Sequence, residues 1–243
     1  MGNIYALTSG KGGVGKSTVS IGLALAFAKL NNKVLLVDMD EGLRCLDVML
    51  GVNESVVFDF GDIVNGKNFG DSIYVTSQSP NLYLIPAPNE MNVITHEALS
   101  IFANKIRGIY DIVIFDFPAG IDFSLYSALP QDTTFLTVAL PDPVSIRDAS
   151  IVSEKLEEME VSTRLILNCF DYKLTKKKIH KSIDDIIDDA SLRLLGIIPR
   201  SKELSLLSIN HKIKPRGKSM KAFTRIAKRL SGKQVLLPKL KKI

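Results

Sequence analysis

The sequence predicts an α/β fold, a single doubly wound, mostly parallel sheet with helices on both faces. Short apolar runs alternate with stretches of helical periodicity along most of the chain. Such alternation implies right-handed crossovers between parallel strands, which place helices on both faces of one sheet. A chain of 243 residues, 46% of them apolar, is long enough for a full core and short enough for one such domain.

The first apolar run leads into a glycine-rich loop of the kind that binds phosphate. Residues 10–17 fit the pattern G-x-x-x-x-G-K-[ST], and a helical pattern follows over residues 17–30. The backbone N–H groups of such a loop and the positive end of the next helix attract a polyphosphate. Lys16 can reach the terminal phosphates and Ser17 can hold Mg²⁺, so we expect a P-loop NTPase. The generic pattern does not require the second lysine of the loop, Lys11.

Two buried runs end in carboxylates. Residues 33–38 (KVLLVD) have the pattern of a central parallel strand, whose C-terminal end borders a ligand crevice, so we expect Asp38 and Asp40 to face the nucleotide. Residues 110–117 (YDIVIFDF) lead to Asp116. A carboxylate at the end of a buried strand is costly unless a cation or hydrogen bonds hold it. Mg²⁺ coordination, direct or through water, is one sufficient reason for Asp116, and a capped structural aspartate is the alternative.

The remaining elements are predicted from the same periodicities. Further strands are expected at residues 3–8, 81–87, 133–140, 163–168 and 194–198. Further helices are expected at residues 43–50, 58–64, 95–107, 144–159, 181–189 and 217–230. Asn168 ends one of these strands, where its side chain can offer both an acceptor and a donor to a nucleobase.

The charge of the chain is divided unequally between its two parts. Residues 1–203 carry 19 Lys or Arg and 26 Asp or Glu, a net −7, whereas residues 204–243 carry 12 basic residues and no acidic one. A basic end of this kind usually marks an anionic partner, either lipid head groups or nucleic acid, and a solvated basic helix with no partner is the alternative. For the amphipathic helix at 217–230, docking on the sheet is favoured over membrane binding.

We expect an ATPase domain over residues 1–232 and a short basic, hydrophobic C-terminal tail over residues 233–243 (KQVLLPKLKKI). The tail could rest on an anionic membrane surface, where so short a segment needs dimerisation to gain avidity. The chain has no apolar run that could span a bilayer and no leader-like N-terminus. These features predict a cytoplasmic protein.

Several segments together resemble the ParA/MinD family of deviant Walker-A ATPases, and within it the MinD branch, over roughly the first 210 residues. The segments are KGGVGKST (11–18), VDMDEGLRCLDVMLG (37–51), FDFPAGI (115–121), PDPVSIRDA (141–149) and LGIIP (195–199). Three features depart from the MinD pattern. Cys45 replaces the usual Asn, Cys169 stands where Arg is common, and the tail is not the typical membrane-targeting helix.

The resemblance implies roles for individual residues. Lys11 would be the signature lysine, which crosses a dimer interface to the phosphates of the other subunit, and Asp148 would help to position it. Lys11, Lys16 and Asp40 would be catalytic, with Asp40 orienting the attacking water. Ser17, Asp40 and Asp116 would hold the metal. The nucleotide would be bound by Gly10, Lys11, Gly12, Gly13, Val14, Gly15, Lys16, Ser17, Thr18, Asn168 and Pro199, with Asn168 at the adenine.

The resemblance also implies a function. ATP and Mg²⁺ would be the cofactors, and ATP would drive formation of a homodimer that acts as a switch in the spatial regulation of cell division. The dimer would bind an anionic membrane surface, at the inner face of the cell membrane, and division-site regulators such as a MinC-like inhibitor. The alternatives are a ParA-like partition ATPase that binds DNA and a flagellar-placement regulator of the same family.

Overall fold

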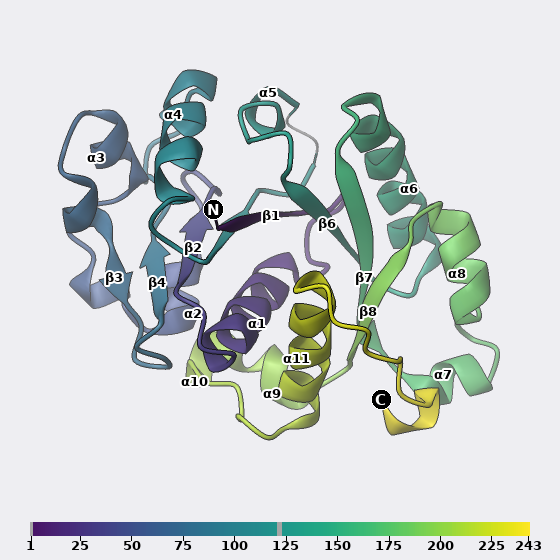
Figure 1. Cartoon of the computed structure of the whole chain (residues 1–243). Helices are drawn as coiled ribbons and strands as arrows, with labels where there is room; N and C mark the ends of the chain where they lie inside the picture. Colours follow the sequence, from purple (N-terminus) through teal and green to yellow (C-terminus); the bar gives the residue numbers. More distant parts are fainter. Residues whose placement is uncertain (1, 121–122) are drawn as a thin grey trace.

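The structure, a computed structural model, describes residues 2–120 and 123–243, so Ile121 of the FDFPAGI segment lies outside the described residues. Eight described strands form one sheet in the order β3-β4-β2-β5-β1-β6-β7-β8 (Figure 1). They are β1 (Asn3–Thr8), β2 (Val34–Asp38), β3 (Tyr74–Val75), β4 (Leu82–Ile85), β5 (Ile112–Asp116), β6 (Thr134–Ala139), β7 (Ser162–Phe170) and β8 (Leu194–Pro199). Only the β3–β4 pair at one edge is antiparallel among these strands. The predicted fold class is confirmed.

Helices cover both faces of this sheet (Figure 1). On one face lie α1 (Lys16–Lys29), α2 (Leu46–Leu50), α9 (Lys202–Ser205), α10 (Leu207–Asn210) and α11 (Lys218–Leu230). On the other lie α3 (Phe60–Val64), α4 (His96–Ile106), α5 (Phe123–Tyr126), α6 (Pro143–Glu158) and α8 (Ile183–Ala190), while α7 (Tyr172–Lys176) follows the end of β7. The short 3-10 helices are η1 (Asn53–Ser55), η2 (Phe69–Ser72) and η3 (Leu240–Lys242). Within the described residues, no helix has the length and apolar content needed to cross a membrane.

The two central helices on the lower face of Figure 1, α1 and α11, are packed closely together. A Cβ atom at Gly22 of α1 would lie 2.2 Å from the Phe223 ring of α11, and a Cβ at Gly196 of β8 would lie 2.4 Å from Ile226. Glycine at these two positions therefore lets α11 approach both the helix and the sheet. The prediction that the amphipathic helix docks on the sheet is confirmed, because its apolar face is buried in the main core.

The tail after α11 runs along the body of the protein. The Arg229 guanidinium donates to the Val235 carbonyl from Nε at 2.8 Å and from Nη2 at 2.6 Å, and it also binds the Leu195 carbonyl. Leu240 and Ile243 pack against the core cluster formed by β6, α6, β7, α8 and β8. Leu236, by contrast, is 91% exposed. The tail thus contacts the body at its end and leaves an apolar side chain in water.

Candidate nucleotide-binding site

The phosphate loop joins β1 to α1 and has the backbone geometry that an anion site needs. Gly13 and Gly15 have φ values of 78° and 84°, in the left-handed region that favours glycine. Gly15 is the N-cap of α1, and neither a capping side chain nor an acidic residue occupies the first turn of that helix. The first N–H groups of α1 are therefore left for a ligand, and the helix dipole adds positive potential there.

The phosphate loop packs closely against α6 and β7. A Cβ atom at Gly10 would lie 2.5 Å from the Asp148 carbonyl oxygen, and one at Gly15 would lie 2.5 Å from the Asn168 amide nitrogen. Asn168 Nδ2 also donates to the Val14 carbonyl at 2.8 Å. The loop is thereby fixed to α6 on one side and to β7 on the other, so its N–H groups are preorganised before a ligand binds.

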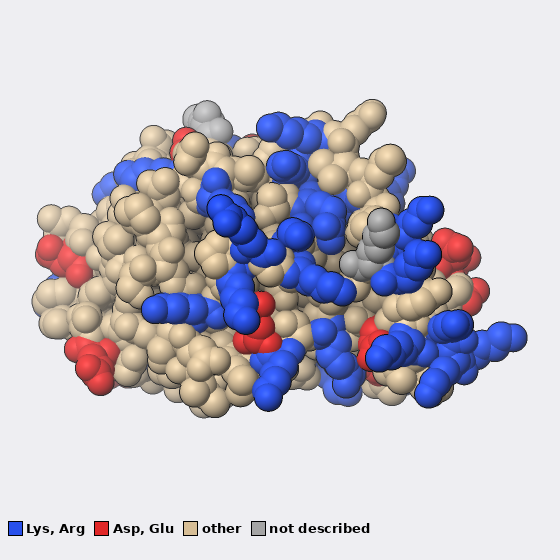
Figure 2. Space-filling model, turned by 90° about the horizontal axis from the view of Figure 1, so that it is seen from below, with Lys and Arg blue, Asp and Glu red and all other residues tan. Residues whose placement is uncertain are grey.

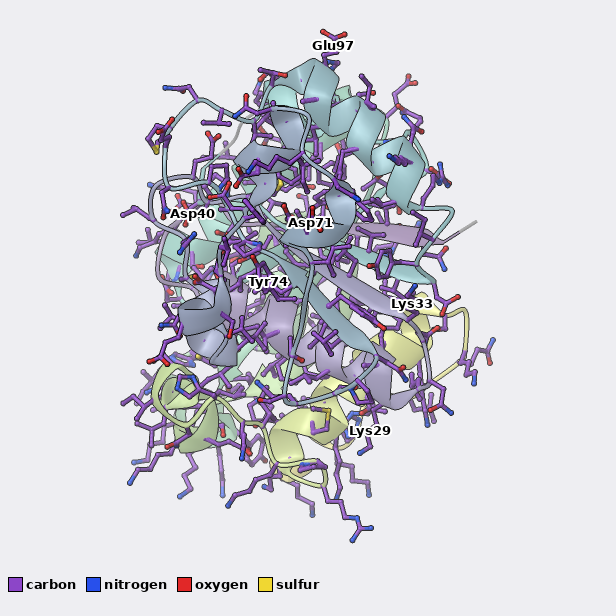
Figure 3. The ribbon with its side chains drawn as sticks, turned by 90° about the vertical axis from the view of Figure 1, so that its left-hand side faces the viewer. Lys29, Lys33, Asp40, Asp71, Tyr74 and Glu97 are labelled. Atoms are coloured by element: carbon purple, nitrogen blue, oxygen red, sulfur yellow. The ribbon has the colours of Figure 1, made fainter. Side chains whose placement is uncertain are left out.

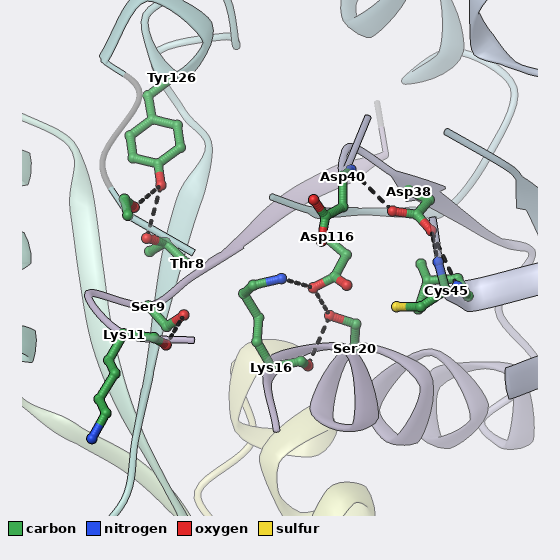
Figure 4. A network of polar contacts seen from close by, with 12 residues as sticks. Thr8, Ser9, Lys11, Lys16, Ser20, Asp38, Asp40, Cys45, Asp116 and Tyr126 are labelled. Atoms are coloured by element: carbon green, nitrogen blue, oxygen red, sulfur yellow. Dashed lines mark hydrogen bonds and ion pairs between the residues drawn. The ribbon is translucent and has the colours of Figure 1, made fainter. Parts of the chain in front are cut away.

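A buried network lies beneath the loop (Figure 4). Lys16 Nζ donates to Asp116 Oδ1 at 3.0 Å, and Ser20 Oγ donates to the same oxygen at 2.7 Å. Lys16 is 8% exposed and Asp116 is fully buried. Sequence reasoning missed Ser20, although its spacing offered a signal, since residue i+4 of a helix lies on the same side as the lysine that ends the loop motif.

The second carboxylate oxygen of Asp116, Oδ2, is buried and has no hydrogen-bond partner among the described residues. An orphaned anionic oxygen at this depth is costly and suits a hard cation. No group of three or more His, Cys, Asp or Glu that could hold a metal occurs in the described part of the chain. Protein sites usually hold Mg²⁺ through one or two carboxylates together with substrate phosphates and water. The residues present therefore fit a magnesium–nucleotide complex.

Asp38, which is predicted to face the nucleotide, is bound by the backbone of the loop that follows β2. Its buried carboxylate accepts hydrogen bonds from the backbone N–H groups of Asp40, Cys45 and Leu46, each at 3.1 Å (Figure 4). Burial and the nearby Asp116 carboxylate raise the pKa of Asp38 to about 7, against the lowering effect of these donors. Asp38 therefore ties the loop that follows β2 to the sheet, a role that depends on contacts with backbone atoms and cannot be read from a motif.

The loop held by Asp38 carries Asp40 and Cys45 beside the phosphate loop. Asp40 is half-buried, and its pKa is raised by burial and by Asp116, while Lys16 lowers it. Burial and the Asp38 carboxylate raise the pKa of the Cys45 thiol to about 11, and a hydrogen bond with Ser17 opposes that rise. The structure thus brings the predicted residues Lys16, Ser17, Asp40 and Asp116 together in one site.

Lys11 lies apart from this cluster. Its side chain is exposed and extends away from the loop (Figure 4), while the Lys11 carbonyl accepts a hydrogen bond from Ser9 Oγ at 3.0 Å. No ion pair involving Lys11 is found in residues 2–120 and 123–243. The Asp148 carboxylate, which is predicted to help position Lys11, pairs with Arg147 at 3.1 Å. The Lys11 ammonium group is therefore exposed at the surface, where a partner molecule could contact it.

A cavity of about 230 Å³ opens beside the phosphate loop on the side of β7 and β8. Its wall includes Gly13, Gly15 and Thr18 from the loop and α1, together with Asn168 and Pro199 from the ends of the two strands. Asn168 is 3% exposed. The cavity continues from the loop and brings Asn168, which is predicted at the adenine, together with Pro199, which is predicted to contact the nucleotide.

The chain is similar to known nucleotide-binding proteins along most of its length. The CobQ/CobB/MinD/ParA nucleotide binding domain matches residues 5–214. The septum site-determining protein MinD of Thermotoga maritima is 35% identical over 254 residues, which cover 98% of this chain and 91% of that protein. Two solved structures share the fold at similar coverage. The MinC:MinD cell division protein complex of Aquifex aeolicus has a TM-score of 0.88 at 31% identity, covering 98% of this chain and 99% of its counterpart. MinD of Pyrococcus horikoshii, complexed with Mg-ADP, has a TM-score of 0.81 at 25% identity, covering 95% and 96%.

Proposed function

We infer the function from one premise: the chain belongs to the CobQ/CobB/MinD/ParA nucleotide-binding family, and it is a MinD-like ATPase of cell-division site placement. The relatives do not favour the alternative of a DNA partition ATPase. The observation that carries the proposal is the pairing of a buried Lys16–Asp116 contact with an exposed Lys11 in the same loop. Lys16 is bound within its own subunit by Asp116, whereas the exposed Lys11 is available to a second subunit.

We propose ATP and Mg²⁺ as the ligands of the site. The open first turn of α1 and the Lys16 ammonium would bind the phosphates, and the Asn168 and Pro199 cavity would take the adenine. Ser17 and Asp116, with Asp40 nearby, would hold Mg²⁺, which neutralises phosphate charge when bound. Support for this assignment comes from the orphaned Oδ2 of Asp116 and from the Mg-ADP bound to the Pyrococcus horikoshii protein.

Asp40 is the residue proposed to orient the attacking water. Its carboxylate sits on the loop that Asp38 ties to the sheet, beside Lys16 and Asp116. Phosphoryl transfer depends mainly on charges that are already positioned around the transferred group. Asp38 would therefore act as a positioning residue for Asp40.

We further propose that ATP joins two copies of this chain face to face. Lys11 of each copy would reach the phosphates bound by the other, so that hydrolysis depends on pairing. The exposed tail residue Leu236 and the lysines around it would bind an anionic membrane, and two tails in one dimer would give the avidity that one lacks. A MinC-like protein is the proposed partner, because the Aquifex aeolicus relative is found in a MinC:MinD complex.

Two lysine substitutions test this mechanism separately. Lys16→Ala should abolish binding of a fluorescent ATP analogue, because it removes the buried phosphate ligand. Lys11→Ala should retain nucleotide binding and lose turnover, and sedimentation with a non-hydrolysable ATP analogue should show a monomer. Wild-type turnover per molecule should rise with protein concentration. Normal, concentration-dependent turnover in Lys11→Ala would exclude a role for Lys11 across the interface.

A further inference from the structure

A cavity of about 510 Å³ at the far end of α1 is not used by the nucleotide site. It is walled by the end of α1, by residues 77–79 ahead of β4, and by the segment 212–215 that precedes α11. Figure 3 shows Lys29 at this place, close to α11. Because Lys16 begins α1 and Lys29 ends it, the length of the helix, about 20 Å, separates the cavity from the phosphate loop. The two sites are therefore distinct.

Among the described residues, all the charged side chains that line the cavity are basic. Lys29, Lys212 and Lys214 contribute to its wall, and no carboxylate does so among the described residues. Lys29 Nζ donates to the Pro215 carbonyl at 2.5 Å, which holds one ammonium at the wall. Gln78 adds an amide Nε2 that is buried and has no acceptor in the described part of the chain. The lining is thus rich in donors, and the nearby Glu203 carboxylate, which accepts a hydrogen bond from the Lys214 backbone N–H, lies outside it.

The cavity also has an apolar floor. Leu25, Ile213 and Met220 contribute to its lining, and each of these side chains is otherwise buried in the main core. No aromatic side chain is among the described lining residues, so a nucleobase would find no ring to stack on. A ligand that matches both the lysines and the floor carries an anionic group next to an aliphatic part.

The surroundings of the cavity indicate where such a ligand would come from. Seen from below, Lys and Arg side chains predominate on the face that carries α9, α10 and α11 (Figure 2). Residues 204–243 contain 12 of the 31 basic residues and no acidic one. A basic surface with an amphiphilic recess suits the surface of an anionic bilayer.

We propose that this cavity binds the phosphate head group of one anionic phospholipid, together with the adjoining part of its acyl chains. Its volume lies within the range of sites for small ligands. The inference rests on the proposed attachment to a membrane and adds a defined lipid site in the folded body, separate from the tail. The folded body would then bind an anionic head group directly, at a site separate from the tail.

A tryptophan reporter can test the site, because the chain contains no tryptophan. Ser77→Trp places the reporter in an exposed part of the wall, and Ile101→Trp on α4 is the matched control at an exposed position outside the cavity. Full-length protein is titrated below the critical micelle concentration with dihexanoyl-phosphatidylglycerol, with dihexanoyl-phosphatidylcholine, and with inorganic phosphate. We expect a saturable blue shift of the tryptophan emission of the Ser77→Trp protein with the anionic lipid only, and none in the control.

Charge-removing variants sharpen the test. Lys212→Gln/Lys214→Gln, made in the Ser77→Trp protein, should weaken the lipid titration by about tenfold or more. Lys176→Gln/Lys177→Gln removes the same charge from exposed lysines at the end of α7 and should leave the titration unchanged. Equal weakening in both double variants would overturn the site, as would an equal response to inorganic phosphate or to the neutral lipid.

Vesicle flotation of the wild-type protein separates this inference from the proposed function. ATP-dependent flotation with anionic vesicles, combined with no response of the Ser77→Trp reporter to the short-chain lipid, would reject the cavity and leave membrane attachment to the tail. A saturable response of that reporter without vesicle flotation would support the lipid site and reject the proposed membrane attachment.

Discussion

Asp116 is the residue on which the buried charges of the site depend. Its Oδ1 accepts from both Lys16 and Ser20, and no other described acidic residue forms an ion pair with Lys16. A buried ammonium that loses its only carboxylate is left without compensation, which costs far more than the loss of a neutral hydrogen bond. The motif-bearing residues Lys16 and Asp116 could be predicted from sequence, but the degree of their mutual dependence could not.

Asp116→Ala should therefore destabilise the nucleotide-free protein by about 3–5 kcal/mol. Ser20→Ala, which removes a hydroxyl from the same oxygen, should cost only about 1 kcal/mol. Urea unfolding followed by circular dichroism measures both. Equal stability of Asp116→Ala and wild type would mean that the Lys16–Asp116 pair does not hold in solution.

Cys45 should be an unreactive thiol despite its place beside the phosphate loop. Burial and the Asp38 carboxylate raise its pKa to about 11, so the thiolate fraction is small at neutral pH. In a Cys169→Ser background, we expect iodoacetamide to modify Cys45 about 100-fold more slowly at pH 8 than it modifies a free thiol of ordinary pKa. The rate should rise about tenfold for each pH unit up to pH 10, because the thiolate is the nucleophile. Rapid, pH-independent modification would contradict the burial seen here.

At the scale of elements, periodicity predicted the long helices and the central strands, but missed several of the shortest pieces. The predicted strand at 163–168 extends two residues further, to Phe170. Helices α5, α7, α9 and α10, each of four or five residues, were not predicted, whereas the equally short α2 and α3 fall within longer predicted helices. Strand β3 was also missed, since its two residues gain their structure by pairing with β4. Contacts between distant segments decide these elements, and a single sequence does not show such contacts.

The packing of α1 on α11 is a long-range contact of this kind. Gly22 lies in the middle of α1, where alanine would normally favour the helix by about 1 kcal/mol. The fully buried Phe223 ring lies in the space that an alanine Cβ would need. Glycine here serves close helix packing and not flexibility.

Gly22→Ala should accordingly destabilise the protein by about 1–3 kcal/mol, although alanine has a higher helix propensity than glycine. Gly108→Ala is the control, since a Cβ atom there meets nothing closer than 3.7 Å. Phe223→Leu should reduce the penalty of Gly22→Ala, and a double-mutant cycle from thermal or urea unfolding measures this coupling. If the two substitutions change the free energy of unfolding additively, the contact between residues 22 and 223 does not limit the packing of α1 on α11.

At the scale of the whole molecule, the chain combines an acidic body with a basic end. Residues 1–203 carry a net −7 and residues 204–243 a net +12. The nucleotide site depends on buried charges, whereas most of the basic side chains in residues 204–243 are exposed. Salt screens exposed charges far more than buried ones, with a Debye length of about 10 Å at 0.1 M and about 3 Å at 1 M. Ionic strength should therefore separate surface attachment from nucleotide chemistry.

We expect ATP-dependent flotation with anionic vesicles to fall steeply between about 0.05 and 0.5 M salt, while ATP binding by the free protein changes little, by about threefold at most. A chain ending at Gly232 should float less than the full chain at every salt concentration, because it lacks Leu236, Leu237 and the lysines of the tail. Neutral vesicles are the control and should recruit neither form. Undiminished flotation of the shortened chain would show that the tail is not the anchor. Salt-sensitive binding to DNA in place of vesicles would show that the basic end serves nucleic acid, the partner that the relatives do not favour.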